Sequence, residues 1–292
     1  MCPGFALDTL PGGPQNPCSA RTKTSTRTER PAILLEYYGR TDVGRKRDHN
    51  EDTFYFSKGD AFCVVADGMG GRKSGEVASK VCVDTLRKHF HYYAPAKQPG
   101  ASWDDIKRSI AMVTTLLRDW IQKINSEIHK LGQQESKVGN MGTTVVLLYM
   151  YDRFGVIAHV GDSRLYRYRE AEGMRRLTDD HSLVGQEVKK GNLSEEEART
   201  SSKKNIVTKA LGTRPTVEPD IQVIEVKDGD VFLLCSDGLS DLVVAEEMGN
   251  IVCNNLEHLD QAVDSFIDLA NARGGKDNIT VIMAQAFDLP QG

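Results

Sequence analysis

The chain has 292 residues, of which 39% are hydrophobic and 27% are charged, as in ordinary globular domains. Its formal net charge of −4 argues against a nucleic acid as the main partner, because binding to phosphate backbones needs a positive surface excess. No apolar run approaches the roughly 20 residues that a membrane helix needs, so we expect no membrane partner.

Residues 1–30 include a segment rich in Ser, Thr and Arg, SARTKTSTRTER. Such a segment cannot pack a core, which predicts a disordered N-terminal tail; an organellar transit peptide is the alternative. The tail lacks the continuous apolar core of a secretory leader. The six cysteines form no CxxC pair, and Cys63 and Cys235 lie in apolar runs where we expect them to be buried. These features together predict a reducing, cytoplasmic location.

Residues 31–292 are globular in composition and contain no linker that would separate a second domain, so we predict a single domain. Its first strands are predicted from apolar runs at 36–42, 53–57 and 61–66. A helix is predicted from about Ser74 to Phe90. Three residues at helical spacing are expected on its buried side: Val77, Val81 and Leu86.

A longer helix is predicted from about Trp103 to Leu131, because apolar residues recur there at helical spacing. Ser102 is its predicted N-cap, and Gly132 is its predicted end. The next two apolar runs, TTVVLLYMY and FGVIAHV, are joined by the short turn Asp152–Arg153. This pattern is typical of a β-hairpin, so we expect these two strands to be antiparallel.

The rest of the chain adds three predicted strands, RLYRYR, VFLLCS and ITVIMAQAF, and two predicted helices at about 244–254 and 258–273. The alternation of helix pairs with strand runs fits an α+β fold with mainly antiparallel sheets. We therefore predict a four-layer α/β/β/α sandwich, in which helices flank a central antiparallel β-sandwich.

Acidic residues stand at the ends of several apolar strands: Asp52, Asp67, Asp162, Asp237 and Asp277. Each one alone has an ordinary explanation, because Asp-Gly pairs commonly form turns. Together they favour a cluster that cations neutralise, since burying carboxylates is costly unless they are paired or bind metal. No His-rich or Cys-rich spacing accompanies these acids, and an all-oxygen site prefers Mg²⁺ or Mn²⁺ to zinc.

The segments that carry these acids resemble the metal-dependent serine/threonine protein phosphatases, the protein phosphatase 2C family, in its bacterial form. The matching motifs are RDHNED at 47–52, VADGMGG at 65–71, GTT at 142–144, HVGDSR at 159–164, LTDDHSLV at 177–184, TKALG at 208–212, SDGLSD at 236–241 and GGKDNIT at 274–280. They appear in the family's order and cover about residues 38–286. The resemblance implies a β-sandwich with metals in a cleft at one end.

The resemblance also implies two main Mn²⁺ or Mg²⁺ ions. Asp67 is expected to bridge them, and the carbonyl of Gly68 to bind one of them. Asp237 and Asp277 are expected to bind the other.

Three further acids match metal positions of the family. Glu51 and Asp52 match positions that hold the metals directly or through water. Asp162 matches a position that, with Asp237, can hold a third and weaker metal.

The implied reaction is hydrolysis of phosphoserine and phosphothreonine by a metal-bridging hydroxide, without a covalent phosphoenzyme. Arg47 matches the phosphate-binding arginine, and Asn278 is expected to fix the turn beside Asp277. The implied partners are phosphoproteins, namely serine/threonine kinases or their targets, and we expect a monomer. A non-catalytic relative and a two-metal nuclease are the alternative functions.

The chain departs from the family pattern after the DG turn, where members often carry a histidine that serves as a candidate general acid. Met69 and Arg72 stand there instead. Arg72 is interpreted either as a solvated residue at the helix start or as a residue that docks the phosphopeptide. We expect a metal-bound water to protonate the leaving group, or protonation to be less effective. His159 and His181 are expected to be structural, with His181 fixing the start of a loop.

That loop, about residues 181–204, matches a mobile flap of the family, and we call it the flap segment. Two short helices are predicted in it, separated by Gly191-Asn192, with Ser194 and Glu197 as a capping box. The family's usual His-Pro is replaced by Ser201-Ser202. The lysines of the segment are interpreted either as a solvated loop or as a basic rim that attracts phosphoproteins.

Overall fold

The computed structural model describes residues 33–70, 74–95, 101–134 and 141–288. By its contacts the chain divides into residues 1–30 and residues 31–292. The predicted N-terminal tail therefore lies outside the described residues.

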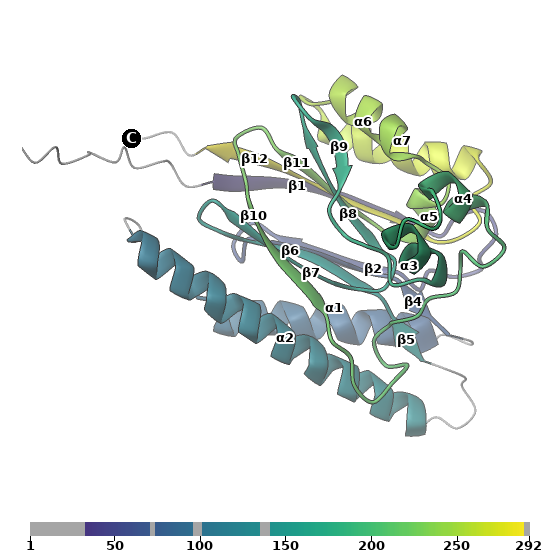
Figure 1. Cartoon of the computed structure of the whole chain (residues 1–292), viewed down its shortest axis with the longest axis horizontal. Coiled ribbons are helices and arrows are strands. Elements are labelled where there is room, and N and C mark those ends of the chain that lie inside the picture. Colours follow the sequence, from purple (N-terminus) through teal and green to yellow (C-terminus); the bar gives the residue numbers. More distant parts are fainter. Residues whose placement is uncertain (1–32, 71–73, 96–100, 135–140, 289–292) are drawn as a thin grey trace, which may run out of the picture. The chain divides into compact units, whose positions relative to one another are not determined.

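Two five-stranded antiparallel sheets form the centre of the second unit (Figure 1). The first contains, in spatial order, β1 (Ile33–Asp42), β12 (Ile279–Asp288), β11 (Val231–Cys235), β8 (Arg164–Arg169) and β9 (Gly173–Arg176). The second contains β10 (Asp220–Glu225), β7 (Phe154–Val160), β6 (Val145–Tyr151), β3 (Phe62–Ala66) and β2 (Thr53–Ser57). Buried side chains from both sheets, including Val65, Leu148, Leu234 and Ile282, form the core between them.

Helices cover the outer face of each sheet, which completes the four predicted layers (Figure 1). α1 (Ser74–Tyr93) and α2 (Trp103–Gln134) pack on the second sheet, and α6 (Ala245–Asn254) and α7 (Leu259–Ala272) pack on the first. The α+β sandwich predicted from the sequence is confirmed. In the described part of the chain, no helix combines the length and the apolar character that crossing a membrane would require.

Several local predictions are confirmed as well. β6 and β7 form the predicted hairpin, with Asp152 at a φ of 55° in its turn. Ser102 caps α2, because its hydroxyl accepts a hydrogen bond from the Asp105 N–H at 3.2 Å. Cys63 and Cys235 are buried free thiols.

Two predictions about the helices were wrong. Gly132 does not end α2, which continues to Gln134; a Cβ on Gly132 would lie 3.3 Å from the Cβ of Met141, so this glycine allows close packing within the helix. Val77 is 44% exposed, because the buried stripe of α1 runs at four-residue spacing through Ala78, Cys82 and Leu86.

The strand ends that carry the predicted acidic residues are surrounded by short elements, most of which were not predicted from the sequence. β4 (Gly68–Met69) pairs with β5 (Gly142–Thr143), and the four-residue helix α5 (Asp237–Ser240) follows β11. The flap segment forms α3 (Leu183–Lys189) and α4 (Glu195–Thr200), as predicted. The predicted capping box between Ser194 and Glu197 is present.

Candidate metal and phosphate site

The fully buried strand β3 ends at Ala66, and the next residue, Asp67, is held by Thr143 of β5 and by Thr144. The N–H of Asp67 donates to the hydroxyl of Thr144 at 3.0 Å. Its carbonyl accepts from the N–H of Thr144 at 2.8 Å and from the hydroxyl of Thr143 at 2.9 Å. The backbone of Asp67 is therefore fixed on both sides, while its carboxylate has no hydrogen bond to these threonines.

Gly68 lies where two other segments approach closely. A Cβ on Gly68 would lie 2.3 Å from the carbonyl oxygen of Gly75 and 2.4 Å from that of Glu51. Any side chain would displace backbone, so this position requires glycine. The N–H of Gly68 donates to the Glu51 carbonyl at 3.2 Å, which brings Glu51 to the end of β3.

Asp52 is buried, and only one of its two carboxylate oxygens has hydrogen-bond partners among the described residues. Its Oδ2 accepts hydrogen bonds from Ser236 Oγ at 2.9 Å and from Thr280 Oγ1 at 2.6 Å. Its Oδ1 is buried without a hydrogen-bond partner among the described residues. An orphaned oxygen on a buried carboxylate is costly, which indicates that another group binds there.

Asn278 connects the loop before β2 to the loop before β12. Its Oδ1 accepts from the N–H of Glu51 at 2.8 Å. Its Nδ2 donates to the carbonyls of Val43 and His49, both at 3.0 Å. The backbone N–H of Asn278 also donates to Asp277 Oδ1 at 2.9 Å, so this one buried residue holds both Glu51 and Asp277 in place.

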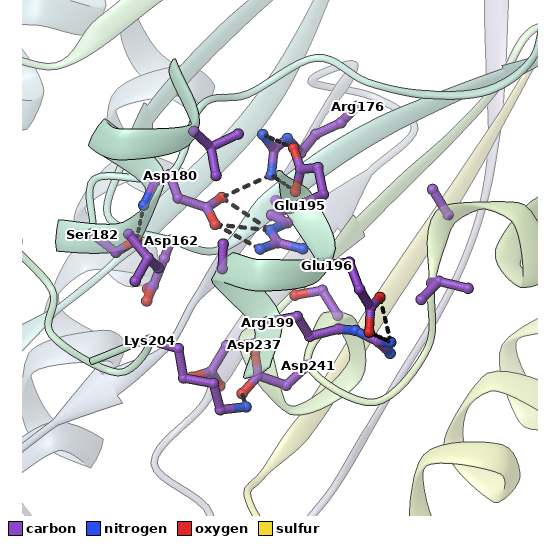
Figure 2. A pocket seen from close by; sticks show the side chains of 18 of the residues that line it. Asp162, Arg176, Asp180, Ser182, Glu195, Glu196, Arg199, Lys204, Asp237 and Asp241 are labelled. Carbon is purple, nitrogen blue, oxygen red and sulfur yellow. Dashed lines mark hydrogen bonds and ion pairs between the residues drawn. The ribbon is translucent and has the colours of Figure 1, made fainter. Parts of the chain in front are cut away.

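Asp237 and Asp162 come from the two different sheets. Asp237 begins α5 immediately after β11, and its Oδ1 is buried without a hydrogen-bond partner in the part of the chain that is described. Asp162 follows β7, two residues after the strand ends at Val160. Both line one pocket (Figure 2).

The electrostatics show that the five aspartates predicted from strand ends converge. Burial raises the pKa of Asp67 well above its usual range. Four other carboxylates raise it further by repulsion, those of Asp52, Asp237, Asp162 and Asp277. Such repulsion requires the charges to lie near one another in a poorly solvated region.

The pKa values of three other carboxylates in this group are raised as well. Burial, with repulsion from Asp162 next, raises the pKa of Asp237 well above its usual range. Burial raises the pKa of Asp52 to about 6 and that of Asp162 to about 6. Asp52 is buried and the other three carboxylates are half-buried, and two of the four carry an oxygen without a hydrogen-bond partner among the described residues. These side chains offer oxygen donors alone, which hard divalent cations prefer.

Arg47 lies at the edge of this group. Its Nη2 is 2.6 Å from Asp277 Oδ2, and 48% of its side chain is exposed. The guanidinium thus reaches a carboxylate of the cluster and still faces solvent. Arg72 lies outside the described residues, so neither interpretation of it is tested.

A pocket of about 230 Å³ opens between the flap segment and the first turns of α5 and α6. Figure 2 shows Asp162 and Asp237 on its wall, with Asp241 beside Asp237. Lys204 of the flap segment forms an ion pair with Asp241. The sequence reading missed Asp241, although its position four residues after Asp237 in SDGLSD places both on one side of a helical turn.

The lysines of the flap segment are mostly paired. Lys189 Nζ is 2.9 Å from Asp179, and Lys190 Nζ is 2.8 Å from Glu187. With Lys204 bound to Asp241, these contacts leave little free positive charge on this side of the pocket. They favour the interpretation of a solvated, locally paired loop over that of a basic rim.

The comparisons with known proteins agree with this geometry. A sequence model of the protein phosphatase 2C family matches residues 43–285. The serine/threonine phosphatase stp of Listeria monocytogenes serovar 1/2a is 39% identical over 260 residues, which cover 86% of this chain and 96% of that protein.

Solved structures give the same result. The serine/threonine phosphatase Stp1 from Staphylococcus aureus matches with a TM-score of 0.76 and 33% identity, over 89% of this chain and 98% of that one. The catalytic domain of the phosphatase PstP, solved in complex with two manganese ions, matches with a TM-score of 0.73 and 31% identity, over 88% and 100% of the two chains. The chain therefore belongs to the protein phosphatase 2C family of metal-dependent phosphoprotein phosphatases.

Proposed function

We propose that the protein hydrolyses phosphoserine and phosphothreonine in proteins at a centre of two Mn²⁺ or Mg²⁺ ions, with a third ion bound more weakly. The convergence of five aspartates, with orphaned oxygens on Asp52 and Asp237, is the observation that carries this proposal. The two manganese ions in the structure of the related PstP support it.

The proposed ligands are those that the family resemblance implies. Asp67, the carbonyl of Gly68, Asp237 and Asp277 would hold the two main ions, and Glu51 and Asp52 would support them directly or through water. Asp162 would join Asp237 at the third ion. When bound, two such ions lower the pKa of water, which supplies hydroxide near neutral pH, and they offset the charge that develops during phosphoryl transfer.

Arg47 is proposed to bind the phosphate. Its planar guanidinium can donate to two phosphate oxygens at once, and its contact with Asp277 orients it at the rim of the cluster. Because the side chain is half-exposed, it can reach a substrate without breaking buried contacts.

Neither His159 nor His181 is free to protonate the leaving group. His159 Nε2 is 2.9 Å from the carbonyl of Asp179, and His181 Nδ1 accepts from the N–H of Gly161 at 3.1 Å. Both rings are committed to structural contacts. We propose that water, and not a histidine, protonates the departing serine or threonine oxygen. No covalent phosphoenzyme would form, because hydroxide and not a side chain would attack the phosphorus.

The substrates are proposed to be serine/threonine kinases or their targets, so the enzyme would counteract kinase signalling, and the chain would act as a monomer. A nuclease would also use a two-metal carboxylate site, but the net charge of −4 does not favour a polyanionic substrate.

The test is hydrolysis of a phosphothreonine peptide and of para-nitrophenyl phosphate with Mn²⁺, with and without EDTA. We expect both substrates to be turned over and EDTA to abolish turnover. An inert protein would contradict the proposal and favour a binding module. Turnover of a phosphodiester alone would favour a nuclease.

A further inference from the structure

The end of strand β7 lies beside the start of the flap segment. His159 is the last residue of β7 that pairs with β10, where it lies opposite Asp220. Gly161 follows with a φ of 111°, a conformation that favours glycine, and a Cβ there would lie 2.6 Å from the Cβ of Thr144. The pairing with β10 ends at His159, so the backbone N–H and carbonyl of Gly161 need other hydrogen-bond partners.

His181 supplies that partner, because it takes up both backbone polar groups of Gly161. The N–H of Gly161 donates to Nδ1 of His181 at 3.1 Å, and the carbonyl of Gly161 accepts from the N–H of His181 at 2.9 Å. Gly161 is buried, so each of these groups would be costly without a partner. One residue of the flap segment thus fixes the peptide units on both sides of Gly161, immediately before Asp162.

The contact at Nδ1 also determines the protonation of the ring. A nitrogen that accepts a hydrogen bond carries no proton, so the neutral ring carries its proton on Nε2. Nε2 lies 3.3 Å from Asp220 Oδ1, which is itself 3.0 Å from Lys209 Nζ. Burial, with His159 and Lys209 next, lowers the pKa of His181 to about 4, so the ring is neutral at pH 7. Lys209 Nζ also lies 3.4 Å from Nε2 and opposes a proton there. The Asp220 carboxylate and the N–H of Gly161 both favour the tautomer that carries its proton on Nε2.

His159, His181 and Asp220 each place one possible ligand atom within 4.8 Å of the others, but these atoms already have hydrogen-bond partners in the protein. The rings of His159 and His181 are stacked, with centroids 4.7 Å apart and 16° between their planes. Their in-plane lone pairs therefore do not converge on one ion. The ammonium group of Lys209 already occupies the Asp220 carboxylate.

We propose that His181 is a positioning residue that holds Asp162, through Gly161, at the place where the third divalent cation binds. This inference rests on the proposed function, in which Asp162 and Asp237 hold that cation. The carbonyl of His181 also accepts from the N–H of Thr208 at 2.7 Å and from its hydroxyl at 2.9 Å. The residue thus connects Asp162 to the chain at both ends of the flap segment.

The test compares His181→Asn with His181→Leu. The carbonyl oxygen of asparagine lies close to the position of Nδ1 and can accept from the N–H of Gly161, whereas leucine has a similar size and no acceptor. Both substitutions remove the contact with Asp220 and the stacking on His159. The pair therefore differs mainly in the hydrogen bond to Gly161. His181→Ala, which also lacks the acceptor, replaces the leucine variant if that variant does not fold.

The first measurement is hydrogen exchange of the Gly161 amide by NMR in protein treated with EDTA, which needs no metal and no activity. We expect exchange to be at least about tenfold faster in the leucine variant than in the asparagine variant, because the amide has lost its acceptor. Equal exchange rates overturn the proposal.

The second measurement is titration with Mn²⁺ by calorimetry. We expect the weakest site to bind about tenfold more weakly in the leucine variant than in the asparagine variant, which corresponds to about 1.4 kcal/mol, while the two tighter sites are unchanged. Equal affinity for the third ion, or a wild-type protein that binds only two ions, overturns the proposal and leaves the two-ion function standing. A wild-type protein that binds no Mn²⁺ contradicts the proposed function itself.

Discussion

Asp162 and Asp237 from the strand ends and Lys204 of the flap segment line one pocket. The acidic group at the strand ends and the lysines of the flap segment nevertheless have different partners. In the first group, Asp52 and Asp237 each have one buried oxygen without a hydrogen-bond partner among the described residues, and burial raises the pKa of both. In the flap segment, Lys189, Lys190 and Lys204 each form an ion pair with a carboxylate.

This difference in pairing shows which group of side chains needs a bound cation as its counter-charge. The strand ends are fixed by buried backbone hydrogen bonds, so their carboxylates cannot separate to relieve repulsion, and a divalent cation is the natural counter-charge. In the flap segment, Glu187 pairs with Lys190, and Asp179 and Asp241 outside the segment pair with Lys189 and Lys204, so these lysines already have counter-charges within the protein. The predictions below test this contrast.

The substitution Asp67→Asn should have the largest effect. We expect turnover of a phosphothreonine peptide with Mn²⁺ to fall by at least about a thousandfold, because the carboxylate proposed to bridge the ions is lost. In EDTA, the melting temperature should stay the same or rise, because one repelling charge has been removed. Glu127→Gln, at an exposed position of α2, is the matched control. A large loss of stability together with activity would indicate general damage and contradict this interpretation.

Arg47→Lys should have the next largest effect. Lysine keeps the charge but loses the planar pair of donors, so we expect kcat/KM for the peptide to fall about 10- to 100-fold. Arg118→Lys changes an exposed arginine of α2 in the same way and should leave kcat/KM unchanged. Equal kinetics for Arg47→Lys and the wild type would remove Arg47 from phosphate binding.

Protonation of Asp52 and Asp162 should stabilise the metal-free protein as the pH falls from 7 to 5, and it acts against His181, whose lowered pKa has the opposite effect. The pKa of Asp52 and of Asp162 is about 6 in the folded protein, against an ordinary value of 3.8. Between these values the unfolded chain releases protons that the folded protein keeps. The stability from these groups is therefore complete below about pH 4 and is lost as the pH rises through 6.

Thermal unfolding in EDTA at pH 7 and pH 5 measures this effect in the wild-type protein and in Asp52→Asn. The melting temperature at pH 5 relative to pH 7 should be a few degrees more favourable in the wild type, because the variant lacks one of the carboxyl groups and keeps the histidines. Mn²⁺ should raise the melting temperature more at pH 7 than at pH 5, because protons compete for the same oxygens. The same pH dependence in both proteins would show that protonation of Asp52 does not contribute to stability.

The substitution Ser194→Ala should have the smallest effect, and only within the flap segment. It removes the N-cap of α4, which costs about 1 kcal/mol locally. We expect faster proteolytic cleavage in the flap segment, a nearly unchanged melting temperature and less than a twofold change in turnover. Ser265→Ala, at an exposed position of α7, should change none of these. A large drop in melting temperature would mean that the flap segment supports the whole fold.

The sequence was informative where the signals are local. An apolar run followed by Asp and Gly predicted the ends of β3 and β11, and the spacing of Ser194 and Glu197 predicted the cap of α4. The four layers followed from the order of helical and strand patterns. These features depend on residues close together in the chain, so their periodicity and turn chemistry are visible without tertiary structure.

Other features depend on distant contacts and could not be predicted. β9 and β10 are short and only partly buried, so they lack the apolar runs that reveal the central strands. The end of α2 was misplaced because Gly132 packs against Met141, a contact that its own helix does not encode. The pairing of Lys204 with Asp241 likewise spans 37 positions.

The most direct test is a crystal structure of the wild-type protein grown with Mn²⁺, with anomalous diffraction recorded at the manganese edge. We predict two strong peaks, one on each side of Asp67, with Asp237 and Asp277 at ligand distance from one of them. Absence of ions from this group of carboxylates at saturating Mn²⁺, or ions bound only elsewhere, would contradict the account.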